Sequence, residues 1–110
     1  MSAQEQSPVD MGNYEVLSDA RTPECSIRLL RVSKGRAVNL HYHKDTVQIY
    51  ICLQGTATAR VRGNAYPLHP NDTLRIPSGV PHAMETDDHA LLLSISIPPL
   101  QTDDQYPVEG

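Results

Sequence analysis

The sequence predicts an all-β fold, arranged as one sandwich or barrel. Short candidate strands follow one another along the chain, separated by turn-forming residues roughly every six to ten positions. No segment keeps the period of an amphipathic helix, and no internal repeat is present. Polar and apolar side chains alternate strictly over residues 56–62, as they do on a half-buried strand. Many evenly spaced short strands with little else are typical of such a fold.

Nine segments have the β-branched, aromatic or alternating apolar residues that favour strands. In chain order they are residues 14–17, 26–32, 37–43, 47–53, 56–62, 66–68, 73–76, 82–86 and 91–97. The connections are rich in Gly, Pro, Asn and Asp, because these residues suit the backbone angles of tight turns. The clearest are Ser33-Lys34-Gly35, Gln54-Gly55, Gly63-Asn64, Pro70-Asn71-Asp72, Pro77-Ser78-Gly79 and Asp87-Asp88.

The 110 residues have room for one domain, and we expect its barrel over residues 13–98. Residues 1–12 are polar and without periodicity, which predicts a flexible N-terminal tail. Pro98 and Pro99 cannot continue a central strand, because proline has no N–H for the ladder. Residues 99–110 are therefore expected to form an acidic C-terminal tail.

Charge and cysteine content argue against several classes of protein. The net charge is −4 and the basic residues are scattered, which disfavours nucleic-acid and membrane-surface partners. The N-terminus lacks the basic and apolar segments of a secretory signal, and no apolar stretch approaches the roughly 20 residues of a membrane span. Cys25 and Cys52 are too few for a disulfide framework. We therefore expect a reduced, cytoplasmic protein.

Four side chains that bind metals well have a spacing that lets them converge. His41 and His43 are two apart on one strand, so both point to the same side, roughly 7 Å apart along the backbone. Gln48 follows a tight connection on the next strand, and His82 follows the rigid turn of residues 77–81. If these strands are neighbours, three imidazoles and one carboxamide oxygen surround a point. Such a set suits one divalent transition-metal ion, with Mn, Fe, Ni and Zn as candidates.

These residues lie in two motifs that resemble those of the cupin family. The motifs are Gly35-x5-His41-x-His43-x4-Gln48-x6-Gly55 and Pro77-x-Gly79-x2-His82, and together they cover about residues 35–86. The resemblance implies a single conical, double-stranded β-barrel of the jelly-roll type, with a metal inside its mouth. It also implies that His41, His43 and His82 are metal ligands.

Two departures from the family pattern matter. Gln48 stands where the usual fourth ligand is Glu, and Asn71 and Thr86 replace the Gly and Asn that usually bracket the second motif. An amide cancels no charge, so an ion here keeps its full +2, attracts anions more strongly and is held less tightly. Small cupins with Gln in this position include enzymes that act on unsaturated uronates and some oxygenases. The alternative is that Gln48 lines the barrel and hydrogen-bonds a metal-bound water.

Other polar residues are candidates for contact with a substrate. Tyr50 and Arg60 are the candidate catalytic residues, and Arg75 and Met84 join them as candidate substrate-binding residues. Tyr50 shares the strand face of Gln48, and Met84 shares that of His82 as apolar wall. Arg60, Arg75 and Arg28 are the candidate cations at the barrel mouth. For each of them, a position on the solvated outer face is the ordinary expectation.

Acid and base groups are scarce in this pattern. His69 and His89 lie next to turns outside both motifs, so we expect them at the surface. The last strand presents one of two sets to the interior: Ser94 and Ser96, or Leu93, Ile95 and Ile97. Neither set contains a carboxylic acid or a base, which argues against simple transfer of uronate chemistry.

The leading functional hypothesis is a metal-dependent enzyme that chelates a small, oxygen-rich, anionic molecule. Oxygenase, isomerase and lyase chemistry all begin with such a chelate; a redox metal with dioxygen uptake would indicate a dioxygenase. The alternative is a non-catalytic sensor or binding module for a sugar-like ligand. A homodimer is also expected, because Leu91, Leu92 and Leu93 form an apolar outer strand. The family resemblance adds that residues 14–17 are exchanged in some such dimers.

Overall fold

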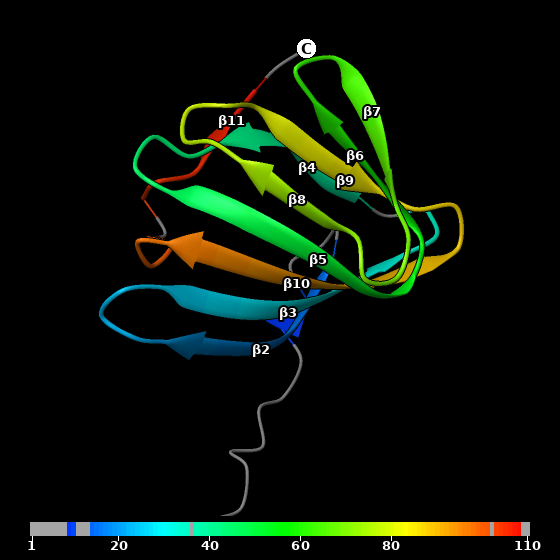
Figure 1. Ribbon diagram of the computed structural model, residues 1–110, viewed down its shortest axis with the longest axis horizontal. Coiled ribbons are helices and arrows are strands. Elements are labelled where there is room, and N and C mark those ends of the chain that lie inside the picture. The colour runs from blue at the N-terminus through cyan, green and yellow to red at the C-terminus, as the bar shows by residue number, and fades with distance from the viewer. Residues whose placement is uncertain (1–8, 11–13, 36, 102, 109–110) are drawn as a thin grey trace, which may run out of the picture.

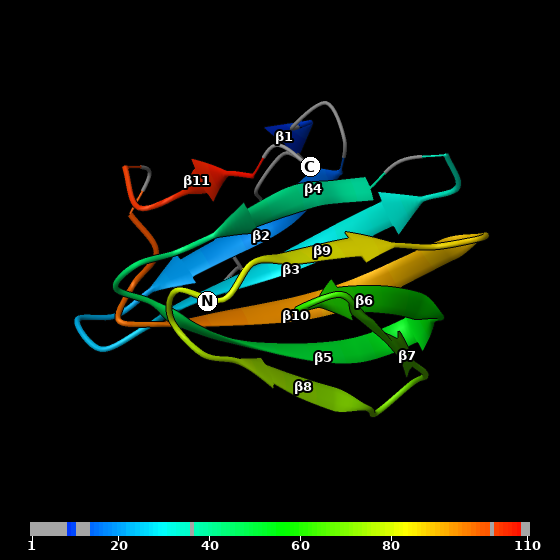
Figure 2. The ribbon, with the colours of Figure 1, turned by 90° about the horizontal axis from the view of Figure 1, so that it is seen from above.

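The computed structural model describes residues 9–10, 14–35, 37–101 and 103–108, which form two antiparallel sheets (Figure 1). The larger sheet has the order β1-β2-β3-β10-β5-β8 and the smaller β11-β4-β9-β6-β7. The strands are β1 (Val9–Asp10), β2 (Glu15–Arg21), β3 (Ser26–Ser33), β4 (Ala37–Tyr42), β5 (Val47–Gly55), β6 (Ala57–Val61), β7 (Asn64–Leu68), β8 (Thr73–Ile76), β9 (His82–Glu85), β10 (His89–Ile97) and β11 (Tyr106–Pro107). The smaller sheet covers one face of the larger (Figure 2). The predicted all-β barrel architecture is confirmed.

All nine predicted segments are strands, and their ends differ for local reasons. β2 continues to Arg21 through polar residues, and a register shift between Val16 and Ser18 interrupts its alternation. β6 ends before Arg62, because Arg62 and Gly63 both have positive φ, at 53° and 79°. Two such residues make the tight hairpin that joins β6 to β7. The short strands β1 and β11 were not predicted.

The structure explains sterically why a glycine ends the first motif. Gly55 has a φ of +73°, and a Cβ built there would lie 2.1 Å from the carbonyl oxygen of His89. No side chain fits that space, so the close approach of the β5 end to β10 requires glycine.

The central strand β10 decides which side chains face the interior. Ser94 and Ser96 are buried at 4% and 2% exposure, so the serine set faces inward. Cross-strand pairing builds three inward rows, which are Gln48–Ser96–Ser26, Tyr50–Ser94–Arg28 and Cys52–Leu92–Leu30. The larger sheet is therefore polar at one end of its inner face and apolar at the other. The apolar end belongs to the core, and the polar end is where a site can form.

The chain after β10 passes beside the polar end. Buried Leu100 donates its N–H to Ser26 Oγ at 2.9 Å and accepts a bond from Arg21 Nη1 at 2.8 Å. β11 then pairs with β4, placing Tyr106 beside Tyr42 and Pro107 beside His41. At the other end of the chain β1 pairs with β2, while residues 1–8 and 11–13 of the expected N-terminal tail lie outside the described residues. The boundaries at residues 12 and 98 stay predictions. The described segments contain no helix with the length and apolarity that a membrane crossing requires.

Candidate metal centre

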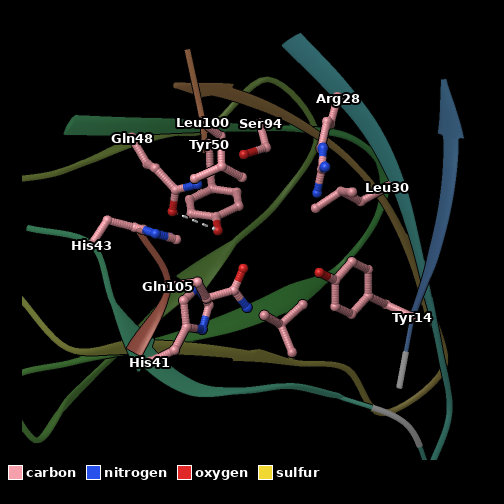
Figure 3. Close-up of a pocket in the computed structure, with 11 residues that line it drawn as sticks. Tyr14, Arg28, Leu30, His41, His43, Gln48, Tyr50, Ser94, Leu100 and Gln105 are labelled. Atoms are coloured by element: carbon pink, nitrogen blue, oxygen red, sulfur yellow. Dashed lines mark hydrogen bonds between the residues drawn. The ribbon is translucent and has the colours of Figure 1, made fainter. Parts of the chain in front are cut away.

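A cavity opens between the sheets at the polar end of the larger one. Counted out to open solvent, its empty space is about 300 Å³, and its lining includes four of the predicted site residues, His41, His43, Gln48 and Tyr50 (Figure 3). These residues come from β4, from the position after it, and from β5. The cavity therefore lies where both sheets contribute side chains.

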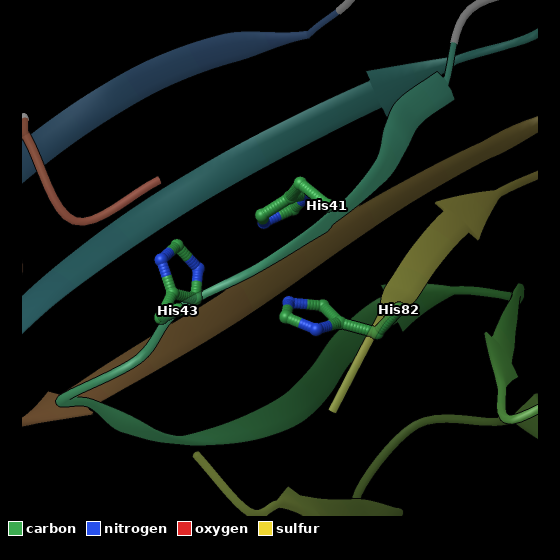
Figure 4. A group of neighbouring side chains, drawn as sticks. All are labelled: His41, His43 and His82. Atoms are coloured by element: carbon green, nitrogen blue, oxygen red, sulfur yellow. The ribbon is translucent and has the colours of Figure 1, made fainter. Parts of the chain in front are cut away.

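His41, His43 and His82 come together beside this cavity (Figure 4). His41 and His82 are register partners, so the sheet holds their rings side by side with centroids 4.4 Å apart. The His43 ring lies 4.8 Å from that of His41 and 5.5 Å from that of His82. All three residues are buried, and one ring nitrogen of each lies within 4.8 Å of the others. Ligands at about 2.1 Å from one ion are about 3–4 Å apart, so small ring rotations bring these nitrogens onto one ion.

A backbone carbonyl orients each imidazole. Because a carbonyl oxygen only accepts, the Nδ1 atom beside it carries the proton and the lone pair is left on Nε2. The contacts are His41 Nδ1 to Asn39 O at 2.6 Å, His43 Nδ1 to Asp104 O at 2.6 Å, and His82 Nδ1 to Val80 O at 3.0 Å. Neutral imidazoles held this way are common ligands of divalent transition metals.

Burial keeps the His41 and His82 rings neutral. It lowers the pKa of His41 and, with the neighbouring His41 ring, lowers the pKa of His82 to about 3. The Nε2 atom of His43 is buried and has no hydrogen-bond partner among the described residues. Leaving such an atom without a partner is unfavourable. A bound cation would provide the missing partner.

Gln48 presents its amide oxygen to the same point. Its Oε1 lies 2.8 Å from His82 Nε2 and accepts a bond from the Tyr50 hydroxyl at 3.1 Å, while its Nε2 donates to Ser96 Oγ at 3.3 Å. A neutral His82 has one ring proton, so it cannot donate both to Val80 O and to Gln48 Oε1. With the proton on Nδ1, the contact between His82 Nε2 and Gln48 Oε1 brings two acceptors together, and a cation bound by both would stabilise it. The residues present fit a divalent transition-metal ion with three nitrogen donors and one oxygen donor.

The other predicted site residues are divided between the cavity and the rest of the molecule. Tyr50 lines the cavity, and burial raises the pKa of its hydroxyl, so it stays a protonated donor. Met84 is buried in the core. Arg75 is exposed, and Arg60 is exposed and pairs with Glu85. The structure does not bring these two arginines to the site.

Sequence reasoning did not assign Tyr14 or Gln105 to the site, and it named Arg28 only as a further cation for the barrel mouth; all three line the cavity. Arg28 lines the cavity instead of taking the solvated face that the pattern also allowed. Its parity with the core residues Leu30 and Val32 was a usable signal. Tyr14 and Gln105 had no such signal, because both lie outside regular strands.

Asp104 clamps the turn that presents His43. Its buried carboxylate accepts the backbone N–H groups of Lys44 and Asp45 at 2.8 and 3.0 Å, and its own carbonyl accepts from His43 Nδ1. The neighbouring Tyr106 ring stacks on Tyr42 at a centroid distance of 5.2 Å. The C-terminal segment thus positions one of the three imidazoles.

We expect Asp104→Ala to weaken metal binding by about 10-fold, the lower end of the loss seen when a group that supports a metal-binding histidine is removed. Alanine keeps the backbone carbonyl that accepts from His43 Nδ1, but the N–H groups of Lys44 and Asp45 lose their acceptor, so the turn that presents His43 is held less firmly. Chelator competition measures the affinity, with the exposed neighbour changed in Asp103→Ala as the matched control. Equal affinities for Asp104→Ala and Asp103→Ala would show that this clamp is dispensable.

Comparison with known proteins agrees with this geometry. The family described as "Cupin domain" matches residues 28–96. Quercetin 2,3-dioxygenase of Bacillus subtilis is 38% identical over 63 residues, which are 57% of this chain and 19% of that enzyme. The matched segment thus spans about a fifth of that relative.

Two solved structures share the fold. KdgF from Halomonas sp. aligns with a TM-score of 0.80 at 20% identity, covering 90% of this chain and 91% of that one. Pac13 from Streptomyces, a nucleoside dehydratase, aligns with a TM-score of 0.83 at 13% identity, covering 98% and 88%. At these identities the likeness shows the fold alone.

Proposed function

The chain belongs to the cupin domain family, and we propose that it binds one divalent transition-metal ion on His41, His43, Gln48 and His82 to bind and transform a small, oxygen-rich anion. The observation that carries this proposal is the convergence of three buried imidazoles whose Nδ1 atoms all contact backbone carbonyls. Mn, Fe, Ni and Zn are the candidate ions. A location in the cytoplasm remains a prediction.

The bound metal would supply Lewis acidity toward a chelating oxygen of the ligand. Around it, Gln48 adds no negative charge, so the centre favours anions more strongly than one with a carboxylate ligand. The Tyr50 hydroxyl, kept protonated by burial, holds the Gln48 amide oxygen in place by a 3.1 Å hydrogen bond. Ser96 orients the same amide from its nitrogen side.

Two observations favour dioxygenase chemistry among the enzymatic alternatives. No carboxylate lines the cavity among the described residues, and its two histidines are proposed metal ligands, so neither kind of side chain is left there to act as a general base. The relative from Bacillus subtilis is named a dioxygenase. The first observation equally supports the second candidate function, a non-catalytic module that binds a small molecule.

Metal reconstitution followed by a turnover screen tests this proposal. Protein loaded separately with Fe, Mn, Ni and Zn is mixed with keto acids, catechols, quercetin and uronates, and oxygen uptake and ultraviolet absorbance are recorded. Oxygen consumption with Fe or Mn alone supports the dioxygenase. Turnover with Ni or Zn without oxygen supports an isomerase or lyase, and saturable binding without turnover supports the binding module. Protein that takes up no metal contradicts the proposal as a whole.

We also propose that the chain forms a homodimer through the outer face of the larger sheet. Leu92 is fully buried, so the expected outer strand is corrected to Leu91 and Leu93. Leu93 is the register partner of Leu29 on β3 and of Ile51 on β5, and all three are half-buried on this face. Aliphatic side chains continue along the outer face of β5 and β10, ending at Leu53 and Ile97, which are 39% and 44% exposed. A second copy presents the same aliphatic strip, which Arg31 and Arg75 flank on the neighbouring strands.

We expect Leu93→Asp to convert the dimer to a monomer, because each interface would then bury two uncompensated carboxylates. Light scattering at micromolar concentration should give about 24 kDa for the wild type, twice the 12.2 kDa of one chain, and one chain for the variant. The control is Tyr66→Asp, at an exposed apolar position on the smaller sheet. A wild-type mass of one chain would contradict the dimer.

A further inference from the structure

The cavity has a second polar end that the metal ligands do not form. Arg28 and the Tyr14 hydroxyl point into it from the side opposite His43 and Gln48 (Figure 3). Arg28 lies in the same cross-strand row as Ser94 and Tyr50, next to the row that contains Gln48. The two ends are therefore built on neighbouring rows of one rigid sheet.

Asp19 holds the Arg28 side chain in place. The two residues are register partners on β2 and β3, and Arg28 Nε donates to Asp19 Oδ2 at 3.1 Å. The Arg28 side chain is 19% exposed. Burial raises the pKa of the Tyr14 and Tyr50 hydroxyls, and the Arg28 charge opposes this effect in part. The guanidinium end of Arg28 points into the cavity, where its N–H donors can face a ligand (Figure 3).

The charges around the cavity are unbalanced. Among the described lining residues none is a carboxylate, and Arg28 is the one that carries a full positive charge at neutral pH. A divalent ion on a neutral ligand set adds two more positive charges at the other end. Asp19, behind Arg28, offsets one positive charge, and it is shared with Arg21, whose Nε lies 3.7 Å from Asp19 Oδ1. At least two positive charges therefore remain, and a ligand with two negative charges would offset them.

We propose that Arg28 and the Tyr14 hydroxyl form an anion subsite, so that the ligand is a short dicarboxylic acid with one carboxylate at the metal and the other at Arg28. The metal end of this proposal rests on the proposed function. The cavity is small, which favours a chain of few carbons. A hydroxy or keto oxygen beside the metal-bound carboxylate fits the same class, because it completes a chelate.

The subsite predicts a measurable preference for dicarboxylates over monocarboxylates. A guanidinium–carboxylate contact in a sheltered site contributes about 10- to 100-fold to binding. The wild type should therefore bind its best-fitting dicarboxylate that much more tightly than the monocarboxylate of equal carbon number. Arg28→Gln should remove this difference and leave metal content and acetate binding near their wild-type values.

Calorimetric titration of Ni(II)-loaded protein tests the subsite. The probes are succinate and glutarate, each against the monocarboxylate of equal length, because shorter dicarboxylates chelate Ni(II) with both carboxylates. Arg31→Gln is the matched control, because Arg31 is an exposed arginine of the same strand that pairs with Glu15 on the outside. Loss of the preference in Arg28→Gln, and its persistence in Arg31→Gln, supports the subsite. A preference that survives Arg28→Gln, or a metal-loaded wild type without one, overturns it.

Two further measurements keep the possible failures separate. The first is the metal content of the same samples, which shows whether the proposed ligands bind a metal at all. If the wild type binds no metal, the Arg28 subsite still predicts weak carboxylate binding, and Arg28→Gln should abolish it. The double variant Asp19→Asn/Arg28→Gln keeps the local net charge of the wild type, which Arg28→Gln alone lowers by one unit while Asp19 stays paired with Arg21. Wild-type preference in a folded double variant would overturn the subsite.

Discussion

Replacing His82 with alanine is expected to abolish stoichiometric metal binding and leave the barrel folded. His82 is the register partner of His41, and its Nε2 atom lies 2.8 Å from Gln48 Oε1, so it adjoins two of the other proposed ligands. Loss of a ligand weakens binding more than the 10- to 100-fold typical for residues that merely orient one, so we expect at least about a 100-fold loss.

The measurement is the metal-to-protein ratio after dialysis against a weak chelator, with circular dichroism as the check on folding. His41→Ala should behave like His82→Ala. His69→Ala is the matched control, because His69 is a histidine whose side chain is 65% exposed. A full equivalent of metal in both His41→Ala and His82→Ala would mean that the proposed ligands are wrong.

Gln48→Glu should change metal retention and anion binding in opposite directions. The substitution preserves the length of the side chain, and Ser96 can donate its hydroxyl to the new carboxylate where it now accepts from the amide. An anionic oxygen binds a divalent ion better than an amide oxygen, so chelator-driven metal loss should slow. The added negative charge should weaken binding of an anionic ligand by roughly 1–3 kcal/mol, because the charges lie a few ångströms apart in a sheltered cavity.

Gln54→Glu is the control for this experiment, since it adds the same charge at an exposed position of β5. It should leave both quantities near their wild-type values. Metal retention equal to the wild type in Gln48→Glu would place Gln48 on the cavity wall and reduce the ligand set to three histidines.

The fold and the centre of the site follow from local sequence features. His41 and His43 share a face because they are two residues apart on a strand, and turn residues mark the connections around them. The family motifs then place Gln48 and His82 against that pair. None of these inferences needs a distant part of the chain except through the family pattern.

The features that sequence reasoning missed depend on contacts made at long range. Asp104 reaches the His43 turn because the chain turns back after Pro98 and Pro99. The sequence pattern predicted a C-terminal tail over this stretch. Arg60 lies outside because Ala57, Ala59 and Val61 face the core, although the same alternation suited either face. Parity alone cannot choose a face; the pairing of neighbouring strands does.

The ligand set is tested most directly by X-ray absorption spectroscopy of the protein loaded with one equivalent of Co(II). The account predicts a first shell of nitrogen and oxygen donors at about 2.1 Å, with outer-ring scattering from three imidazoles that falls to two or fewer in His82→Ala. The His69→Ala spectrum should match the wild type. A wild-type spectrum without imidazole scattering, or one that His82→Ala leaves unchanged, would contradict the metal centre described above.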